Sequence, residues 1–186
     1  MAKDQDGKDT KKPNGDGPKP AGTGAGPAQS AAAGARTSSQ AQLGVLAQYV
    51  KDLSFESPGA PQTLQGPGEN PQLQIGVNVN AGPRGDDLHE VVVHIEAHAK
   101  SDAGVIYNIE LDYAGLFRIK DVPQHLLQPV MFVDCPTLIF PFVRRVIADV
   151  VRDGGFPPLM LDPIDFNGLY AQNLAKSAEG DTGQPN

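Results

Sequence analysis

The chain has 186 residues, of which 39% are hydrophobic and 6% aromatic, a composition that allows one folded domain with a modest core. Charge is divided unevenly: the first 42 residues carry six basic and four acidic side chains, whereas the remainder carries nine basic and eighteen acidic ones. This excess of carboxylates argues against nucleic acid and anionic membranes as partners of the folded part and favours a basic partner.

The N-terminal segment is rich in proline, glycine and alanine and contains no leucine, isoleucine, valine or aromatic residue before Leu43. Such a segment buries too little apolar surface to offset its chain entropy, so residues 1–41 are predicted to be a disordered tail. Its aspartates argue against a transit peptide, and it lacks the apolar stretch of a secretory signal. No run of about 18 apolar residues occurs, so no membrane insertion is predicted. The single Cys135 excludes an internal disulfide and suits the reducing cytoplasm.

The strands come first in the folded part. Residues 43–55 are predicted to be an extended or partly helical lead-in to a proline-rich loop. Alternating apolar and polar residues then predict strands at 72–80, 88–100 and 105–112. A bulge or bend at Ala114-Gly115 should precede a short fourth strand at 116–119. Short turns between these strands make them antiparallel neighbours.

The hydrophobic period changes to that of helices after the strands. Asp121 is predicted to cap a short helix near Pro123. A longer helix follows Pro136 and ends at Gly154-Gly155. An extended crossing loop then leads to a last amphipathic helix, which is capped by Asp165 and runs to about Lys176.

The order of these elements predicts an α+β fold, with a four-stranded antiparallel sheet and two main helices packed on one face. The folded domain should span 42–176, and 177–186 should be a disordered polar tail. A core of this size leaves apolar helix and loop surface without an internal partner. Surface of that kind marks oligomer or ligand interfaces.

Four segments resemble the SecB family of bacterial protein-export chaperones. They are the opening motif at 51–58 (KDLSFESP), the end of the third strand at 113–117 (YAGLF), the start of the main helix at 135–144 (CPTLIFPFVR) and the crossing loop at 154–166 (GGFPPLMLDPIDF). The resemblance covers residues 42–176 without large gaps. It implies a SecB-like fold assembled as a homotetramer, a dimer of dimers.

The resemblance also implies a function. SecB-like chaperones are not enzymes and use no ATP or other cofactor; they hold unfolded precursor proteins in surface grooves in the cytoplasm and deliver them to the SecA motor. Asp52, Glu56 and Glu110 match the family's acids that contact the basic, zinc-carrying C-terminal tail of SecA. Asn108 departs from the apolar neighbour expected beside Glu110. Clustered carboxylates on a sheet face would steer such a basic segment by charge.

A second set of residues corresponds to segments that line the family's grooves for unfolded protein. Apolar periodicity alone reports only burial, so each of these side chains could equally be core. They are Phe55, Leu73, Ile75, Val77, Leu159, Leu161, Phe166, Leu169 and Tyr170.

Two alternative functions are considered. A small metal-dependent hydrolase could use His94, Glu96 and His98, which share one strand face and are adequate metal ligands. On a flat strand such side chains diverge and no fourth ligand is visible, so no metal site is predicted and a polar strand face is the better interpretation. The other alternative is a SecB-like chaperone for a client outside export, such as an antitoxin. Cys135, at a helix entrance without a histidine partner, is interpreted as structural.

Overall fold

The computed structural model describes residues 41–66 and 68–180. Residues 1–40, which form nearly all of the predicted N-terminal tail, and residues 181–186 lie outside the described part. The prediction for these two segments therefore stays a prediction.

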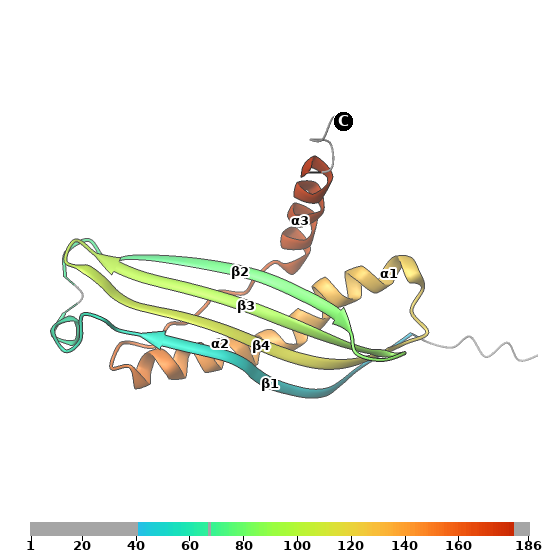
Figure 1. Ribbon diagram of the computed structural model, residues 1–186, viewed down its shortest axis with the longest axis horizontal. Helices are drawn as coiled ribbons and strands as arrows, with labels where there is room; N and C mark the ends of the chain where they lie inside the picture. Colours follow the sequence, from blue (N-terminus) through green and yellow to red (C-terminus); the bar gives the residue numbers. More distant parts are fainter. Residues whose placement is uncertain (1–40, 67, 181–186) are drawn as a thin grey trace, which may run out of the picture. The chain divides into compact units, whose positions relative to one another are not determined.

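A four-stranded antiparallel sheet forms the centre of the described domain (Figure 1). The strands are β1 (Gln42–Glu56), β2 (Gln72–Pro83), β3 (Leu88–Ser101) and β4 (Gly104–Lys120). Their order across the sheet is β1-β4-β3-β2, so β1 and β2 are the two edges. A short 3-10 helix, η1 (Gln62–Leu64), lies in the loop between the edge strands. The predicted α+β class is confirmed.

Strand β1 corrects the prediction of an extended or partly helical lead-in at 43–55. Its register against β4 shifts between Val45 and Ala47 and again between Val50 and Asp52. Each shift inserts one extra residue into β1, so the β1 side chains that share one face of the sheet no longer follow a period of two. The pairing places the following β1 residues on one face: Leu43, Val45, Gln48, Val50, Leu53 and Phe55.

Strand β4 corrects a second prediction, because the strand is not interrupted at Ala114-Gly115. The strand runs unbroken to Lys120, and the predicted third and fourth strands are one. Gly115 is needed here for packing rather than for a bend. A Cβ atom at this position would lie 2.5 Å from the ring of Phe117.

A nearly continuous helical run follows the sheet. It consists of α1 (Gln124–Pro129), the five-residue π-helical segment η2 (Val130–Asp134) and α2 (Cys135–Asp153). The last helix, α3 (Phe166–Gly180), extends beyond Lys176, where the sequence predicts the start of a polar tail. A π-helical turn adds one residue to the helical repeat, which interrupts the hydrophobic period. Pro129 and Pro136 lie on either side of it, so the sequence predicted two separate helices rather than one run.

The helix ends partly follow the sequence prediction. Helix α1 has Pro123 at its N-cap without a side-chain cap, so Asp121 is not the predicted cap; it has a positive φ of 57° in the preceding turn. Asp165 does cap α3, because its carboxylate accepts a hydrogen bond from the Gly168 amide at 3.0 Å. Helix α2 ends at Gly154 as predicted.

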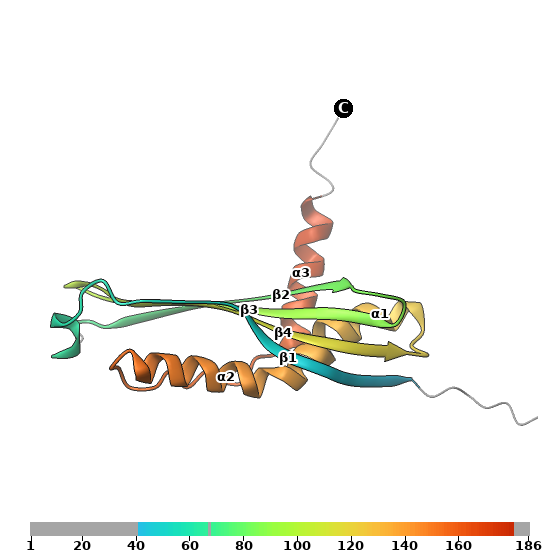
Figure 2. The ribbon, with the colours of Figure 1, turned by 60° about the horizontal axis from the view of Figure 1, so that its bottom comes forward.

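Helix α2 lies along one face of the sheet, and the opposite face is open (Figure 2). Four side chains of α2 recur on its sheet-facing side and are completely buried: Ile139, Val143, Ile147 and Val151. They pack in one core with Ile95 of β3 and Leu111 and Phe117 of β4. Burial of side chains of this size stabilises the fold by about 1.5–3 kcal/mol each, so this row fixes α2 on the sheet.

The run Gln124–Asp153 is, by length and composition, apolar enough to cross a membrane. Its apolar character has another source in this fold. One side of α2 fills the core, and the other side carries the exposed Leu138 and Phe142. The run is thus a core helix with a second apolar side that faces outward in the protomer.

Glu90 on β3 ties both the edge strand β1 and the β2–β3 turn to the sheet. The residue is 7% exposed, and its carboxylate accepts hydrogen bonds from the Tyr49 hydroxyl, from the Lys51 ammonium at 2.9 Å and from the Arg84 guanidinium. The hydrogen bond from Tyr49, followed by those from Lys51 and Arg84, lowers the pKa of Glu90 to about 2. Glu90 is therefore ionised and fully paired over the whole physiological range.

Replacing Glu90 with glutamine should lower the free energy of unfolding by about 1–3 kcal/mol at pH 7, because the partly buried hydrogen bonds from Tyr49, Lys51 and Arg84 no longer end on a negative charge. The folded pKa is depressed, so the contribution of the carboxylate is present above its ordinary pKa of 4.5 and is lost as the pH falls toward about 2. Urea unfolding at several pH values should show the difference between wild type and Glu90→Gln shrinking in this window. The exposed Glu69→Gln serves as control, and a difference that does not change with pH would contradict the assignment.

Candidate functional site: a groove along β2 and an acidic sheet face

A pocket of about 350 Å³ lies at one end of the sheet. Its walls come from three places: Leu73 and Tyr107 on β2 and β4, Leu64 in η1, and Phe156 with Pro157 in the loop after α2. The lining is mainly apolar, and 43% of Leu73 is exposed. An apolar pocket open to solvent on this scale accommodates one or two large side chains.

Aromatic rings form the wall of this pocket. The Tyr107 and Phe156 rings are 5.2 Å apart between centroids, and Phe55 stacks on Tyr107 at 5.8 Å. Gly154 makes this packing possible, since a Cβ atom there would lie 2.3 Å from the Phe55 ring. The two glycines after α2 thus bring Phe156 onto the sheet as well as ending the helix.

A second pocket of about 340 Å³ follows the first along the same edge strand. Ile75 and Val77 of β2 line one side, and Ile164 with Leu169 at the start of α3 lines the other. Residues 73, 75 and 77 alternate along β2 and face the same side, so one strand supplies both pockets. We refer to the two pockets and this row of β2 side chains as the β2 groove.

The structure divides the predicted groove residues into two groups. Leu73, Ile75, Val77 and Leu169 line the two pockets, and Phe55 supports the aromatic wall. Four others line neither of these two pockets: Leu159, Leu161, Phe166 and Tyr170.

The burial of these four residues explains their position. Leu161 and Phe166 are core residues, 4% and 3% exposed, and lie beneath the groove. Leu159 is half-buried against the same core. Tyr170 stacks on the Phe132 ring at 5.9 Å, so its ring belongs to the contact between α3 and η2.

The sequence analysis missed Tyr107, Phe156 and Leu64 as pocket residues. Tyr107 belongs to the alternating apolar face of its strand and is indistinguishable from core by period. Leu64 lies in a proline-rich loop without periodicity. The aromatic residue directly after Gly154-Gly155 was a signal in the sequence, since an exposed loop rarely needs one.

The open face of the sheet carries an ordered set of polar side chains. Register places Asp52, Asp112 and His94 side by side across β1, β4 and β3. The next row is Ser54, Glu110 and Glu96. The row after that is Glu56, Asn108 and His98. These nine residues form the acidic face, which includes all three acids that the sequence analysis assigned to SecA binding.

The acidic face contains five carboxylates and no lysine or arginine. Two like-charged pairs are direct neighbours across the sheet, Asp52 with Asp112 and Glu96 with Glu110. Such pairs destabilise a sheet by about 0.2–1 kcal/mol each. The edge strand β2 adds only Gln74, Gly76 and Asn78 beside these rows, so nothing there neutralises the charge.

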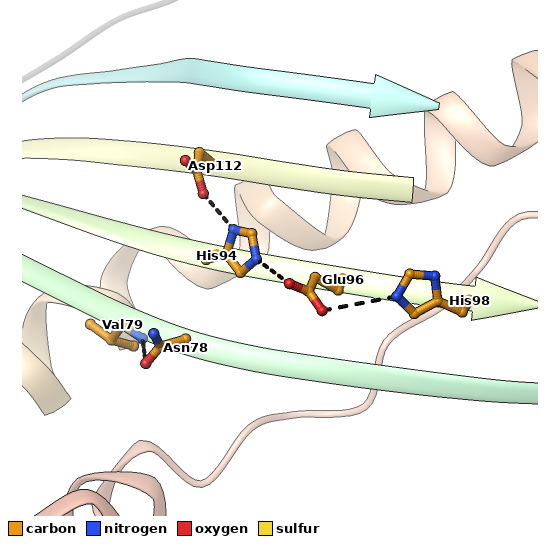
Figure 3. A network of polar contacts seen from close by, with 6 residues as sticks. All are labelled: Asn78, Val79, His94, Glu96, His98 and Asp112. Atoms are coloured by element: carbon orange, nitrogen blue, oxygen red, sulfur yellow. Dashed lines mark hydrogen bonds and ion pairs between the residues drawn. The ribbon is translucent and has the colours of Figure 1, made fainter. Parts of the chain in front are cut away.

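His94 is the centre of a hydrogen-bonded network on this face (Figure 3). Its Nδ1 lies 2.6 Å from Asp112 Oδ1, and its Nε2 lies 2.9 Å from Glu96 Oε1. His98 Nδ1 lies 3.0 Å from Asn108 Oδ1, and its Nε2 lies 3.9 Å from Glu96. Asn108 thus pairs with a histidine in place of the apolar side chain that the resemblance leads us to expect there.

The network raises the pKa of His94 above its ordinary value, chiefly through the hydrogen bond to Glu96 and, against partial burial, through Asp112. The same hydrogen bond lowers the pKa of Glu96. The hydrogen-bond geometry also indicates a protonated His94. Each ring nitrogen faces a carboxylate, which accepts but does not donate, and only the imidazolium donates from both nitrogens. His94 is therefore a cation held between two carboxylates.

The ligand set of a metal-dependent hydrolase does not form here. Among residues 41–66 and 68–180, no group of three or more histidine, cysteine, aspartate or glutamate side chains is arranged to hold a metal ion. His94, Glu96 and His98 lie in one line along β3 (Figure 3). His94 hydrogen-bonds to Glu96, whereas His98 Nε2 is 3.9 Å from that carboxylate. Cys135 is completely buried, and burial raises the pKa of its thiol to about 12, so it is unreactive.

The described domain is thus a small α+β protein, with helix α2 along one face of a four-stranded sheet and an apolar groove at the sheet's β2 edge. The family model described as preprotein translocase subunit SecB matches residues 36–177. The chain belongs to the SecB family, whose members are chaperones of protein export and translocation.

Similar proteins agree with this family. The chain is 52% identical to the protein-export protein SecB of Rhodopseudomonas palustris strain TIE-1, over 77% of this chain and 90% of that protein. It is also 52% identical, with the same coverage, to the protein of that name from Bradyrhizobium diazoefficiens. A solved SecB-like chaperone of Mycobacterium tuberculosis, in complex with a peptide from the HigA1 antitoxin, has the same fold. Its TM-score is 0.51 at 20% identity, over 71% of this chain and 96% of that one.

Proposed function

We propose that this protein is an ATP-independent holdase that binds unfolded precursor proteins in the cytoplasm, keeps them competent for translocation and delivers them to SecA. The observation that carries the proposal is the β2 groove: an apolar row, Leu73, Ile75 and Val77, on a strand whose outer edge has no partner strand in the described protomer. An extended client can insert side chains into the pockets and bond the free edge with its backbone.

The acidic face supports the second half of the proposal. Its carboxylates lie on the side of the sheet away from α2 and the β2 groove, so a basic partner and an unfolded client have separate surfaces. The five carboxylates exceed the two histidines of this face, and the like-charged pairs across the sheet have a stability cost that a functional surface would explain. The basic, zinc-carrying tail of SecA has the complementary charge.

Exposed apolar side chains support the homotetramer, a dimer of dimers. On β1, Leu43, Val45, Val50 and Leu53 lie on the core side of the sheet, yet each is 36–43% exposed. On α2, Leu138 is 47% and Phe142 42% exposed. No element among residues 41–66 and 68–180 covers these side chains, and contiguous apolar surface next to a free strand edge favours association with further copies.

The double variant Leu138→Glu/Phe142→Glu should dissociate the assembly into smaller species, because two carboxylates would have to be buried in the interface. Light scattering coupled to size exclusion gives the mass directly. Gln62→Glu in η1 adds exposed charge elsewhere and should leave the mass unchanged. An unaltered mass in the double variant would place the interface on another surface.

The test of the proposed function is an aggregation assay. Stoichiometric amounts of the protein should delay the aggregation of a denatured precursor without ATP, and the native mass should increase by that of the precursor. If the protein neither delays aggregation nor gains mass, the proposed function is wrong.

A second candidate is a chaperone for an antitoxin, which the peptide-bound complex of the Mycobacterium tuberculosis protein brings into consideration. The far closer relatives are named for protein export, which favours the export function. A pull-down with the SecA tail in one arm and an antitoxin in the other distinguishes the two.

A further inference from the structure

The only side chains on the acidic face that can become cations are two histidines. In the three rows of this face, His94 and His98 stand where a lysine or arginine would normally balance the carboxylates. The charge of the face therefore changes within the pH range of histidine titration, while the five carboxylates stay ionised.

As an imidazolium, His94 donates hydrogen bonds to two of those carboxylates. Asp112 approaches one ring nitrogen at 2.6 Å and Glu96 the other at 2.9 Å (Figure 3). The His94 side chain is 28% exposed, so an external cation can reach the same oxygens by displacing it. When the proton is lost, only one of the two hydrogen bonds can persist, and both carboxylates lose the positive charge between them.

The other groups around His94 do not replace this cation. Glu110 on β4 and Asp52 on β1 are further carboxylates, and β2 contributes the uncharged Asn78, Gly76 and Gln74. His98 on the same strand is 3.9 Å from Glu96.

Two positive charges near this face are engaged elsewhere. Lys51 on β1 and Arg84 after β2 are held by Glu90 on β3, which also accepts a hydrogen bond from Tyr49. Lys100 lies on β3 beyond His98, opposite Gln72 of β2. The core side of the sheet beneath His94 is formed by the buried Val93 and Ile95.

We propose that His94 is a proton-dependent switch of the acidic face: the imidazolium competes with a basic partner for Glu96 and Asp112, and its deprotonation releases them. The inference rests on the proposed function, because it regulates the surface assigned there to SecA. Binding of a basic segment is then coupled to proton release from His94, and by reciprocity the bound segment lowers the pKa of His94.

The experiment compares wild type with His94→Gln, which has no titratable group at this position. Affinity for a zinc-loaded peptide of the SecA tail is measured by calorimetry from pH 6 to pH 8.5 at constant ionic strength. Wild type should bind about threefold to fivefold more tightly at the higher pH, the effect of one charge near the contact. His94→Gln should bind at pH 6 as wild type does at pH 8.5. Any titration of the peptide itself affects both proteins equally.

Two controls make the result specific. His125→Gln removes an exposed histidine on α1 and should keep the wild-type pH profile. In NMR, the His94 ring should titrate at a lower pH in the peptide complex than in the free protein. Identical pH profiles for wild type and His94→Gln would overturn the switch and leave the proposed function intact. Absence of peptide binding at every pH would overturn both delivery to SecA and the switch.

Discussion

The double variant Leu73→Asp/Ile75→Asp should hold denatured precursor at least about tenfold more weakly than wild type. Leu73 lines the first pocket and Ile75 the second, and both side chains are more than two-fifths exposed in the free protein. A client that covers them removes apolar surface from water, at about 25 cal/mol per Å². In the variant the same client would have to desolvate two carboxylates, and a loss of 1.4 kcal/mol already corresponds to about tenfold in affinity.

Gln74→Asp is the matched control for this variant. Gln74 lies between the two residues on the same strand but faces the opposite side of the sheet, so its replacement adds a negative charge to this strand outside the groove. Client affinity is measured from the dependence of precursor aggregation on chaperone concentration, and the fold is checked by thermal unfolding. Equal loss in Gln74→Asp would indicate a general charge effect, and full retention of client holding in Leu73→Asp/Ile75→Asp would show that clients bind elsewhere.

The charge-reversed double variant Asp52→Lys/Glu110→Lys should abolish measurable binding of the SecA tail, a loss of at least about tenfold, and leave client holding largely intact. Each substitution removes an attractive charge from the acidic face and adds a repulsive one. Close charge pairs at interfaces contribute about 1.5 kcal/mol or more, so two reversals exceed the sensitivity of a pull-down.

Unfolding of the variant would be a trivial cause of this loss, and the sheet pairing argues against it. Asp52 lies directly opposite Asp112, and Glu110 lies opposite Glu96. Each lysine therefore converts a like-charged pair into an opposite-charged one, and thermal stability should be equal to or above that of wild type.

Wild-type affinity for the tail should fall with added salt. Retained tail binding in the variant would move the SecA contact to another surface.

The sequence determined much of the local structure and the family. Alternation predicted β2 and β3, which pair with each other without a register shift, so their faces follow a period of two. Asp165 and Gly154 are local signals that act through one or two hydrogen bonds, so their roles at the helix ends follow from sequence alone. The motifs at 51–58 and 154–166 indicated the SecB family, and the family model agrees.

The composition of the acidic face depends on the register of the strands. Asp52, Glu56 and Glu110 were predicted as a site from the resemblance, but their position beside His94, Glu96 and Asp112 depends on how β1 pairs with β4. The two bulges of β1 set that pairing, and a bulge is a tertiary feature, because the extra residue is accommodated only against a partner strand. The His94 network joins residues of β3 and β4 in the same way.

The predicted groove residues differ in how deeply the fold buries them. Leu159, Leu161 and Phe166 have the same apolar character as Leu73 and Ile75, and no local pattern separates a groove residue from a core residue. The difference arises when α2 and the crossing loop pack on the sheet: Leu161 and Phe166 are covered, whereas the row on the edge strand β2 stays exposed. Sequence thus determined which residues are apolar and where the chain turns, and tertiary packing decided which apolar surface remains open, because exposure depends on contacts between segments distant in the chain.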